Sequence, residues 1–316
     1  MHSKRIYILT YLLFSSCLIF SQTISLPFYL DKRKHIIVSY IIKGEKVKLL
    51  LDTGWEGDMI DTQLADKLNT LPHKQNRAID MLTSSGEHYT EILPDNGTSK
   101  YIDTLFNYPW TLTDIKKTAK SLRFDDATDG IVGIDFNNSK YILEFDFKHN
   151  QLKFWNSLPQ NYLKGREFYK ATLLRSDYGQ ESKYSCNFAK YPNIKGSLSI
   201  LDTVQLHPLF FFDTGSTASY LSLQIYDSLI LKQLIDYKKI ISQKYGPDYP
   251  TIHCQIPELG IDSFCANCSV TRVMPDVFNL YKKNHLRVLL GMNFFLQYEK
   301  VIFDFKRKIG YFIKRN

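Results

Sequence analysis

The 316-residue sequence has no low-complexity tract, only five cysteines, and no apolar run after its first 22 residues that is long enough to span a bilayer. Because it combines 44% hydrophobic with 23% charged residues, it does not fit disordered, collagen-like or coiled-coil proteins. It also lacks a Gly-x-Ser-x-Gly motif and a glycine-rich phosphate-binding loop. The sequence signatures of serine hydrolases and of nucleotide-binding proteins are therefore missing.

The positive charge of the chain is not concentrated in one segment of the sequence. The formal net charge is +8, but the densest basic runs of the mature chain, Lys32-Arg33-Lys34 and Lys306-Arg307-Lys308, are separated by nearly the whole sequence. A nucleic-acid-binding protein gathers its positive charge on one face or segment, so we interpret these runs as solvated surface and expect no nucleic-acid partner. The 21 Tyr and 21 Phe favour strands, and we expect an all-β protein.

Residues 1–22 have the pattern of a secretory signal peptide. Lys4 and Arg5 precede an apolar stretch that ends near Gln22. We therefore expect an exported protein, periplasmic or secreted, with no transmembrane span in the mature chain. Cys17 weakly resembles a bacterial lipoprotein processing site, although the apolar residues 18–20 that follow it argue against cleavage there; an envelope lipoprotein with an assembly role stays open as an alternative.

Removal of this leader leaves four cysteines, Cys186, Cys254, Cys265 and Cys268. An even number in an oxidising compartment predicts up to two disulfides, whose pairing the sequence leaves open. A zinc site built from Cys254, Cys265 and Cys268 with His253 or His285 is the alternative, but there is only one Cys-x-x-Cys pair and export favours disulfides. We expect no metal and no cofactor.

The chain repeats itself. Leu49-Leu50-Leu51 leads into Asp52-Thr53-Gly54, and Phe210-Phe211-Phe212 leads into Asp213-Thr214-Gly215. An apolar segment ending in glycine follows each motif, at Gly133 and Gly291, and twelve residues later both halves carry Phe-Asp-Phe-Lys. Three elements in the same order at near-equal spacing predict two copies of one module. The predicted boundaries are an N-terminal lobe at 23–156, a linker at 157–170 and a C-terminal lobe at 171–316.

Local patterns predict the content of the first module. Strand-like residues on both sides of Lys43-Gly44 predict a β-hairpin. Asp61 is a suitable N-cap for a short helix that carries Leu64, Ala65 and Leu68 and ends near Asn69.

Two Asp-Thr-Gly turns related by duplication can bring two carboxylates within a few Å of each other. Such a pair shares one proton, so that one carboxylate activates water while the protonated partner hydrogen-bonds a scissile carbonyl. Pepsin is the best-known enzyme with this arrangement.

These motifs resemble the aspartic peptidases of the pepsin and retropepsin kind, over most of the mature chain. The resemblance implies a bilobal acid-protease fold of two duplicated β-barrel-like lobes with short helices, acting as a monomeric endopeptidase on peptide or unfolded protein. It implies that Asp52 and Asp213 are catalytic. The implied supporting residues are Thr53, Gly54, Thr214, Gly215, Ser216, Gly133 and Gly291.

Two features depart from that family. Trp55 stands where a small residue is usual, so it either lines the cleft or displaces the loop. A catalytically impaired protein that binds peptide in the cleft is therefore an alternative. If catalysis is intact, the missing hydroxyl at position 55 predicts a less acidic optimum than that of pepsin. The candidate flap is the segment around Gly86, with Tyr89 able to contact substrate, and an ordinary surface hairpin is the alternative there.

Overall fold

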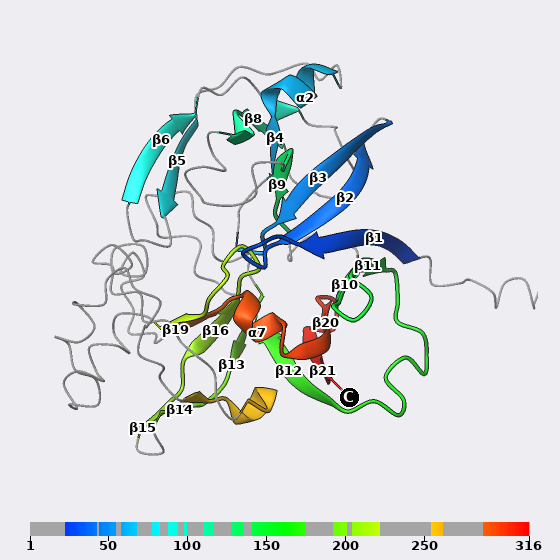
Figure 1. Cartoon of the computed structure of the whole chain (residues 1–316). Coiled ribbons are helices and arrows are strands. Elements are labelled where there is room, and N and C mark those ends of the chain that lie inside the picture. Colours follow the sequence, from blue (N-terminus) through cyan, green and yellow to red (C-terminus); the bar gives the residue numbers. More distant parts are fainter. Residues whose placement is uncertain are drawn as a thin grey trace, which may run out of the picture.

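The computed structural model contains mostly β-strands and few helices (Figure 1), which confirms the all-β prediction. It describes residues 23–42, 44–54, 58–67, 77–82, 88–93, 98–99, 110–116, 128–134, 141–174, 192–200, 204–221, 254–261 and 287–315. The elements of the first half are β1 Thr23–Leu30, β2 Ile36–Ile42, β3 Glu45–Leu51, β4 Asp58–Asp61, α2 Thr62–Lys67, β5 Arg77–Leu82, β6 His88–Leu93, β7 Thr98–Ser99, β8 Trp110–Thr113, β9 Gly130–Val132, β10 Ile142–Asp146 and β11 Gln151–Trp155. Those of the second half are β12 Phe168–Leu174, β13 Asn193–Lys195, β14 Leu198–Ile200, β15 Val204–Leu206, β16 Leu209–Phe212, β17 Tyr220–Leu221, β18 Cys254–Gln255, the 3₁₀ helix η2 Pro257–Leu259, β19 Arg287–Leu290, α7 Met292–Phe295, β20 Tyr298–Asp304 and β21 Ile309–Lys314.

The predicted first hairpin and the first part of the predicted helix are confirmed, whereas Leu68 and Asn69 lie outside the described residues. Strands β2 and β3 pair antiparallel, and Gly44 adopts φ +88° at their turn, a conformation that glycine tolerates best. Helix α2 begins after Asp61, whose Oδ1 accepts hydrogen bonds from the N–H groups of Gln63 and Leu64 at 2.9 and 3.4 Å. This is the capping expected of an aspartate at a helix start.

The duplication seen in the sequence reappears in the strand pairing. Strand β3 pairs in parallel with β9, and β16 pairs in parallel with β19. In each half a further strand, β4 or β17, lies antiparallel to the second member of the pair. Each Asp-Thr-Gly sequence therefore follows directly after a strand. The parallel neighbour of that strand belongs to the apolar segment that ends in Gly133 or Gly291.

The repeated Phe-Asp-Phe-Lys segments join the two halves. Strand β10 pairs antiparallel with β20, with Phe145 opposite Val301, and the surrounding strand order is β12-β21-β20-β10-β11-β1. On one face of this sheet lies a phenylalanine core, in which the rings of Phe145 and Phe303 lie 6.1 Å apart and those of Phe212 and Phe303 lie 5.2 Å apart. Burial of each ring contributes about 2 kcal/mol.

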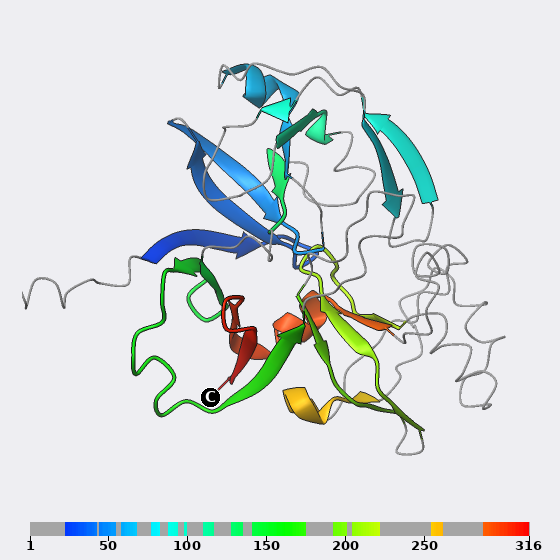
Figure 2. The same ribbon diagram turned by 180° about the vertical axis from the view of Figure 1, so that it is seen from behind.

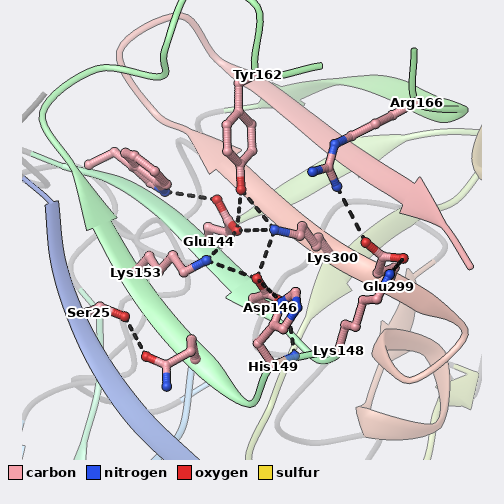
Figure 3. A network of polar contacts seen from close by, with 12 residues as sticks. Ser25, Glu144, Asp146, Lys148, His149, Lys153, Tyr162, Arg166, Glu299 and Lys300 are labelled. Atoms are coloured by element: carbon pink, nitrogen blue, oxygen red, sulfur yellow. Dashed lines mark hydrogen bonds and ion pairs between the residues drawn. The ribbon is translucent and has the colours of Figure 1, made fainter. Parts of the chain in front are cut away.

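The same sheet also holds a buried charge cluster, formed by Glu144 and Asp146 on β10, Lys153 on β11 and Lys300 on β20 (Figure 3). Lys300 Nζ lies 3.0 Å from Glu144 Oε1 and 2.8 Å from Asp146 Oδ2, and Lys153 Nζ lies 2.9 Å from Asp146 Oδ2. The hydroxyl of Tyr162 donates to Glu144 Oε1 at 2.6 Å. These contacts give Asp146 a structural role within the sheet.

Several predicted features lie wholly or partly outside the described residues. These are the leader 1–22, Trp55, Gly86, Cys186, Cys265 and Cys268. The hairpin predicted around Gly86 has its two strands in place, with β5 antiparallel to β6 and Met81 opposite Tyr89, while the turn between them is not described. In the predicted linker, β12 already begins at Phe168. Among the described residues, we find no helix that combines the length and the apolar character needed to cross a membrane.

Candidate active site

The two Asp-Thr-Gly loops start in the same way. The backbone N–H of Asp52 donates to Val132 O at 2.9 Å, and that of Asp213 donates to Leu290 O at 2.9 Å. Each loop is thus hydrogen-bonded to the parallel neighbour of the strand that precedes it, β9 for the first loop and β19 for the second. In Figures 1 and 2 the connections that follow β3 and β16 converge near the centre of the molecule.

Thr53 and Thr214 bond the loops to each other. Each backbone N–H donates to the hydroxyl of the other threonine, at 3.0 Å for Thr53 N and 2.9 Å for Thr214 N. Each hydroxyl in turn donates to the last carbonyl of the opposite strand, Thr53 Oγ1 to Phe212 O at 2.9 Å and Thr214 Oγ1 to Leu51 O at 2.8 Å. Both threonines are fully buried, so four satisfied hydrogen bonds hold the loops in register.

Each aspartate carboxyl lies against the glycine of the other loop. A Cβ built on Gly215 would lie 2.2 Å from Asp52 Cγ, and one on Gly54 would lie 2.5 Å from Asp213 Cγ. A side chain at either glycine would collide with the opposite carboxyl. The motif therefore needs glycine at its third position because the two carboxyls meet across the loops.

Backbone donors and burial set the charge on the two carboxyls. Gly54 N donates to Asp52 Oδ1 at 2.8 Å, while Gly215 N and Ser216 N donate to Asp213 Oδ1 at 2.9 and 3.2 Å. Loss of water around the buried carboxyl, together with the charge of Asp213 and a hydrogen bond to it, raises the pKa of Asp52 well above its ordinary value. Burial also raises the pKa of Asp213, but the hydrogen bond from Asp52 and those from Gly215 and Ser216 oppose that rise.

The backbone donors indicate which carboxyl keeps the negative charge. Two carboxyls in contact do not both ionise cheaply, so one proton stays on the pair over a range of pH. Asp213 Oδ1 accepts hydrogen bonds from two backbone N–H groups and Asp52 Oδ1 from one, and donors of this kind favour the charged form of a carboxyl. The arrangement favours a protonated Asp52 beside an ionised Asp213, which provides one acid and one base.

Ser219 and Asn293 support the second loop, a role that no sequence motif predicted. Ser219 Oγ donates to Asn293 Oδ1 at 2.7 Å and accepts from Gly291 N at 3.1 Å. Met292 N donates to Ser216 O at 2.7 Å, and a Cβ on Gly291 would lie 2.1 Å from Ala218 O. Gly291 is thus required where the end of β19 passes behind the second loop.

The remaining predicted site residues are described only in part. Ser216 Oγ donates to Ala218 O at 2.8 Å, so its hydroxyl supports the loop and its backbone N–H contacts Asp213. Gly133 is buried directly after β9. Tyr89 lies in β6, and Trp55 and Gly86 are outside the described residues. No group of metal-binding side chains occurs within the part of the chain that the structure describes.

No protein-family model matches this chain, and no curated protein sequence matches it.

Proposed function

We propose that this protein is an aspartic endopeptidase with a bilobal acid-protease fold. The observation that carries the proposal is the pair of aspartates whose carboxyls contact each other and the opposite glycines, on loops joined by the reciprocal bonds of Thr53 and Thr214. The parallel pairs β3–β9 and β16–β19 support the proposal that each lobe is one copy of the same unit.

In the proposed mechanism the two carboxyls have different tasks. Ionised Asp213 removes a proton from a water molecule as its oxygen attacks the carbonyl carbon of the scissile peptide bond. Protonated Asp52 donates a hydrogen bond, and then its proton, to the carbonyl oxygen. Collapse of the tetrahedral intermediate breaks the C–N bond: the leaving amine takes up the proton that Asp213 had accepted, and one hydroxyl of the intermediate returns its proton to Asp52. The products are a carboxylic acid and an amine, with no covalent intermediate on the enzyme.

The substrate proposal follows from the same arrangement. An extended peptide would lie between the lobes over the two aspartates, with the β5–β6 hairpin as a flap whose Gly86 and Tyr89 contact it. Trp55, next to the first motif, would line the cleft. Because both halves of the site belong to one chain, a monomer suffices. We further propose that residues 1–22 direct export to the periplasm or the medium.

The test is cleavage of a mixed library of unstructured peptides by the purified mature protein between pH 3 and 8. An Asp52→Asn variant and a general inhibitor of aspartic peptidases are the controls, and mass spectrometry identifies the products. Cleavage that both controls abolish is expected. A folded protein that cleaves nothing at any pH would overturn the proposal, and peptide binding without cleavage would then identify the impaired, peptide-binding alternative.

A further inference from the structure

The second aspartate loop is hydrogen-bonded at four points to one short segment, residues 290–293, which joins β19 to α7. The bonds run from Asp213 N to Leu290 O at 2.9 Å, from Met292 N to Ser216 O at 2.7 Å, from Asn293 N to Thr217 O at 3.2 Å and from Gly291 N to Ser219 Oγ at 3.1 Å. The position of the loop that carries Asp213 therefore depends on this segment.

Ser219 is the one side chain of the loop that takes part in two of these contacts. Its hydroxyl accepts from Gly291 N–H and donates to Asn293 Oδ1 at 2.7 Å. Ser219 is fully buried, so a partner that loses its bond to this hydroxyl does not simply bond to solvent instead. The turn 216–219 is thus held at both ends, through the carbonyl of Ser216 and the hydroxyl of Ser219.

The turn 216–219 presents a backbone donor to the catalytic carboxyl. Ser216 N–H donates to Asp213 Oδ1 at 3.2 Å, whereas the hydroxyl of Ser216 donates to Ala218 O at 2.8 Å. A distance of 3.2 Å is at the long end of the range for an N–H···O bond, so a small displacement of the turn would break this contact. The contact is made because residues 290–293 fix the backbone of Ser216.

Helix α7 is itself firmly anchored. Phe294 and Phe295 are fully buried, and the ring of Phe295 lies 6.0 Å from that of Phe212 and 5.6 Å from that of Phe145. Phe212 directly precedes Asp213, and Phe145 belongs to the first half of the chain. In Figures 1 and 2, α7 accordingly lies next to β16 near the centre of the molecule. A side chain supported by a packed element of this kind can hold a site in a precise geometry.

We propose that Ser219 and Asn293 are positioning residues of the catalytic pair: by fixing the turn 216–219 they hold Ser216 N–H against Asp213 Oδ1, and so favour the ionised form that a general base needs. This inference rests on the proposed peptidase function. A Ser219 that only stabilised the fold would affect the free energy of unfolding and leave the pH profile of activity unchanged.

The direction of the effect follows from the groups around Asp213. Burial raises its pKa, and Ser216 N–H is among the donors that oppose the rise, so loss of this donor moves the pKa further up. The base then ionises only at higher pH. The titratable groups that act on Asp213 are Asp52 on the first loop and His35 on the β1–β2 turn. Segments 216–219 and 290–293 carry no titratable side chain, so substitutions there change no charge in the site.

The experiment measures kcat/KM between pH 3 and 8 for wild-type protein and Ser219→Ala, on a peptide that the wild type cleaves. Ser219→Ala removes both bonds of the hydroxyl. We expect the acid limb to move upward by about 0.5–1 pH unit, which is roughly a three- to tenfold loss on that limb and little loss above it. An acid limb that stays in place in the folded variant would overturn the proposal.

Asn293→Ala is the second variant, and it also serves if Ser219→Ala does not fold. It removes only the bond from the Ser219 hydroxyl and keeps the backbone bonds of residues 290–293, so a smaller shift in the same direction is expected. The double variant should shift no further than Ser219→Ala, because Asn293 acts through Ser219. An unchanged limb in Asn293→Ala, or shifts that add in the double variant, would contradict the assigned roles.

The matched control is Ser25→Ala. Ser25 Oγ also donates to a side-chain amide oxygen, Oε1 of Gln151, but this pair is exposed and joins β1 to β11. The control substitution is expected to leave the acid limb unchanged. A shift of equal size in Ser25→Ala and Ser219→Ala would contradict the assignment of the effect to the second loop.

A measurement on the carboxyls themselves needs no activity. NMR of ¹³C-labelled aspartate follows the titration of Asp52 and Asp213 in wild-type protein and in Ser219→Ala. The lower of the two pKa values of the pair is expected to rise in the variant, and an unchanged value would refute the inference. Failure of the peptidase proposal is recognised separately, as a wild-type protein that cleaves nothing while this difference between the two proteins is present.

Discussion

Thr53 and Thr214 donate their backbone N–H groups to each other's hydroxyls, at 3.0 and 2.9 Å, although 161 residues separate them in the chain. Their hydroxyls also reach the carbonyls that end β16 and β3. This relationship fixes the distance between the two aspartates, because each threonine directly follows one of them. The geometry of the pair therefore depends on two hydroxyl groups that perform no chemistry themselves.

The first prediction removes one of these hydroxyls. Thr53→Val preserves the shape of the side chain but leaves Thr214 N–H and Phe212 O without their partner. Two buried backbone groups that lose a hydrogen bond should lower the free energy of unfolding by about 2 kcal/mol or more, measured by urea denaturation. Thr172→Val is the control at an exposed strand position and should change it by less than about 0.5 kcal/mol. Equal effects at both positions would contradict the bracing role of Thr53.

The second prediction concerns the close approach of Gly215 to Asp52. Gly215→Ala places a methyl group 2.2 Å from Asp52 Cγ, so the carboxyl must move and catalysis should fall by about 100-fold or more. Gly165→Ala serves as the comparison. It strains a turn at φ +74° but meets no atom within 4 Å, so we expect lower stability with kcat/KM retained. A Gly215→Ala enzyme of normal activity would show that the carboxyls do not meet as described.

The third prediction concerns acid stability. Burial alone would raise the pKa of Asp146, but hydrogen bonds from Lys300, Lys153 and His149 outweigh it and hold this pKa well below its ordinary value. A carboxyl with a lowered pKa stabilises the fold fully above its unfolded pKa, near 3.9, and progressively less as pH falls further.

Asp146→Asn should therefore lower the free energy of unfolding by about 3 kcal/mol near pH 6, and this difference from wild type should shrink below about pH 4. Denaturant unfolding at several pH values measures it. The exposed pair of Glu167 and Lys314, 3.3 Å apart, provides the control, and Glu167→Gln should leave the free energy of unfolding close to that of wild type throughout. If the loss in free energy of unfolding caused by Asp146→Asn grew as the pH falls, the prediction would be contradicted.

The fourth prediction is the pH of maximal activity. Burial raises the pKa of both catalytic carboxyls, so the pair keeps its shared proton to a higher pH than two exposed carboxyls would. Activity should peak above about pH 4, the ordinary carboxyl pKa. A kcat/KM profile from pH 3 to 8 measures this, and a maximum below pH 4 would contradict it.

The local parts of this fold were predictable, and the contacts between distant segments were not. Gly44 and Asp61 act within a few residues of their own position, so the hairpin turn and the helix cap could be inferred from short patterns. The two Asp-Thr-Gly motifs were found because the duplication repeats them. The bonds from each threonine to Phe212 O and Leu51 O required the two loops to be placed together.

The buried charge cluster shows the same limit. Glu144 and Lys300 are 156 residues apart, and nothing in the sequence pairs one charged strand residue with another at that distance. No sequence pattern pointed to Asn293, the partner of Ser219, because it is an ordinary polar residue in a short helix.

The central claim is that Asp52 and Asp213 act as one unit, and a double-mutant comparison tests it most directly. On a peptide that the wild-type protein cleaves, Asp52→Asn and Asp213→Asn should each reduce kcat by at least about 10²–10⁴-fold, the range of a lost acid or base. Because neither carboxyl works without the other, the double variant should be no slower than the slower single variant. Effects that multiply in the double variant, or a single variant that keeps the wild-type rate, would contradict the account.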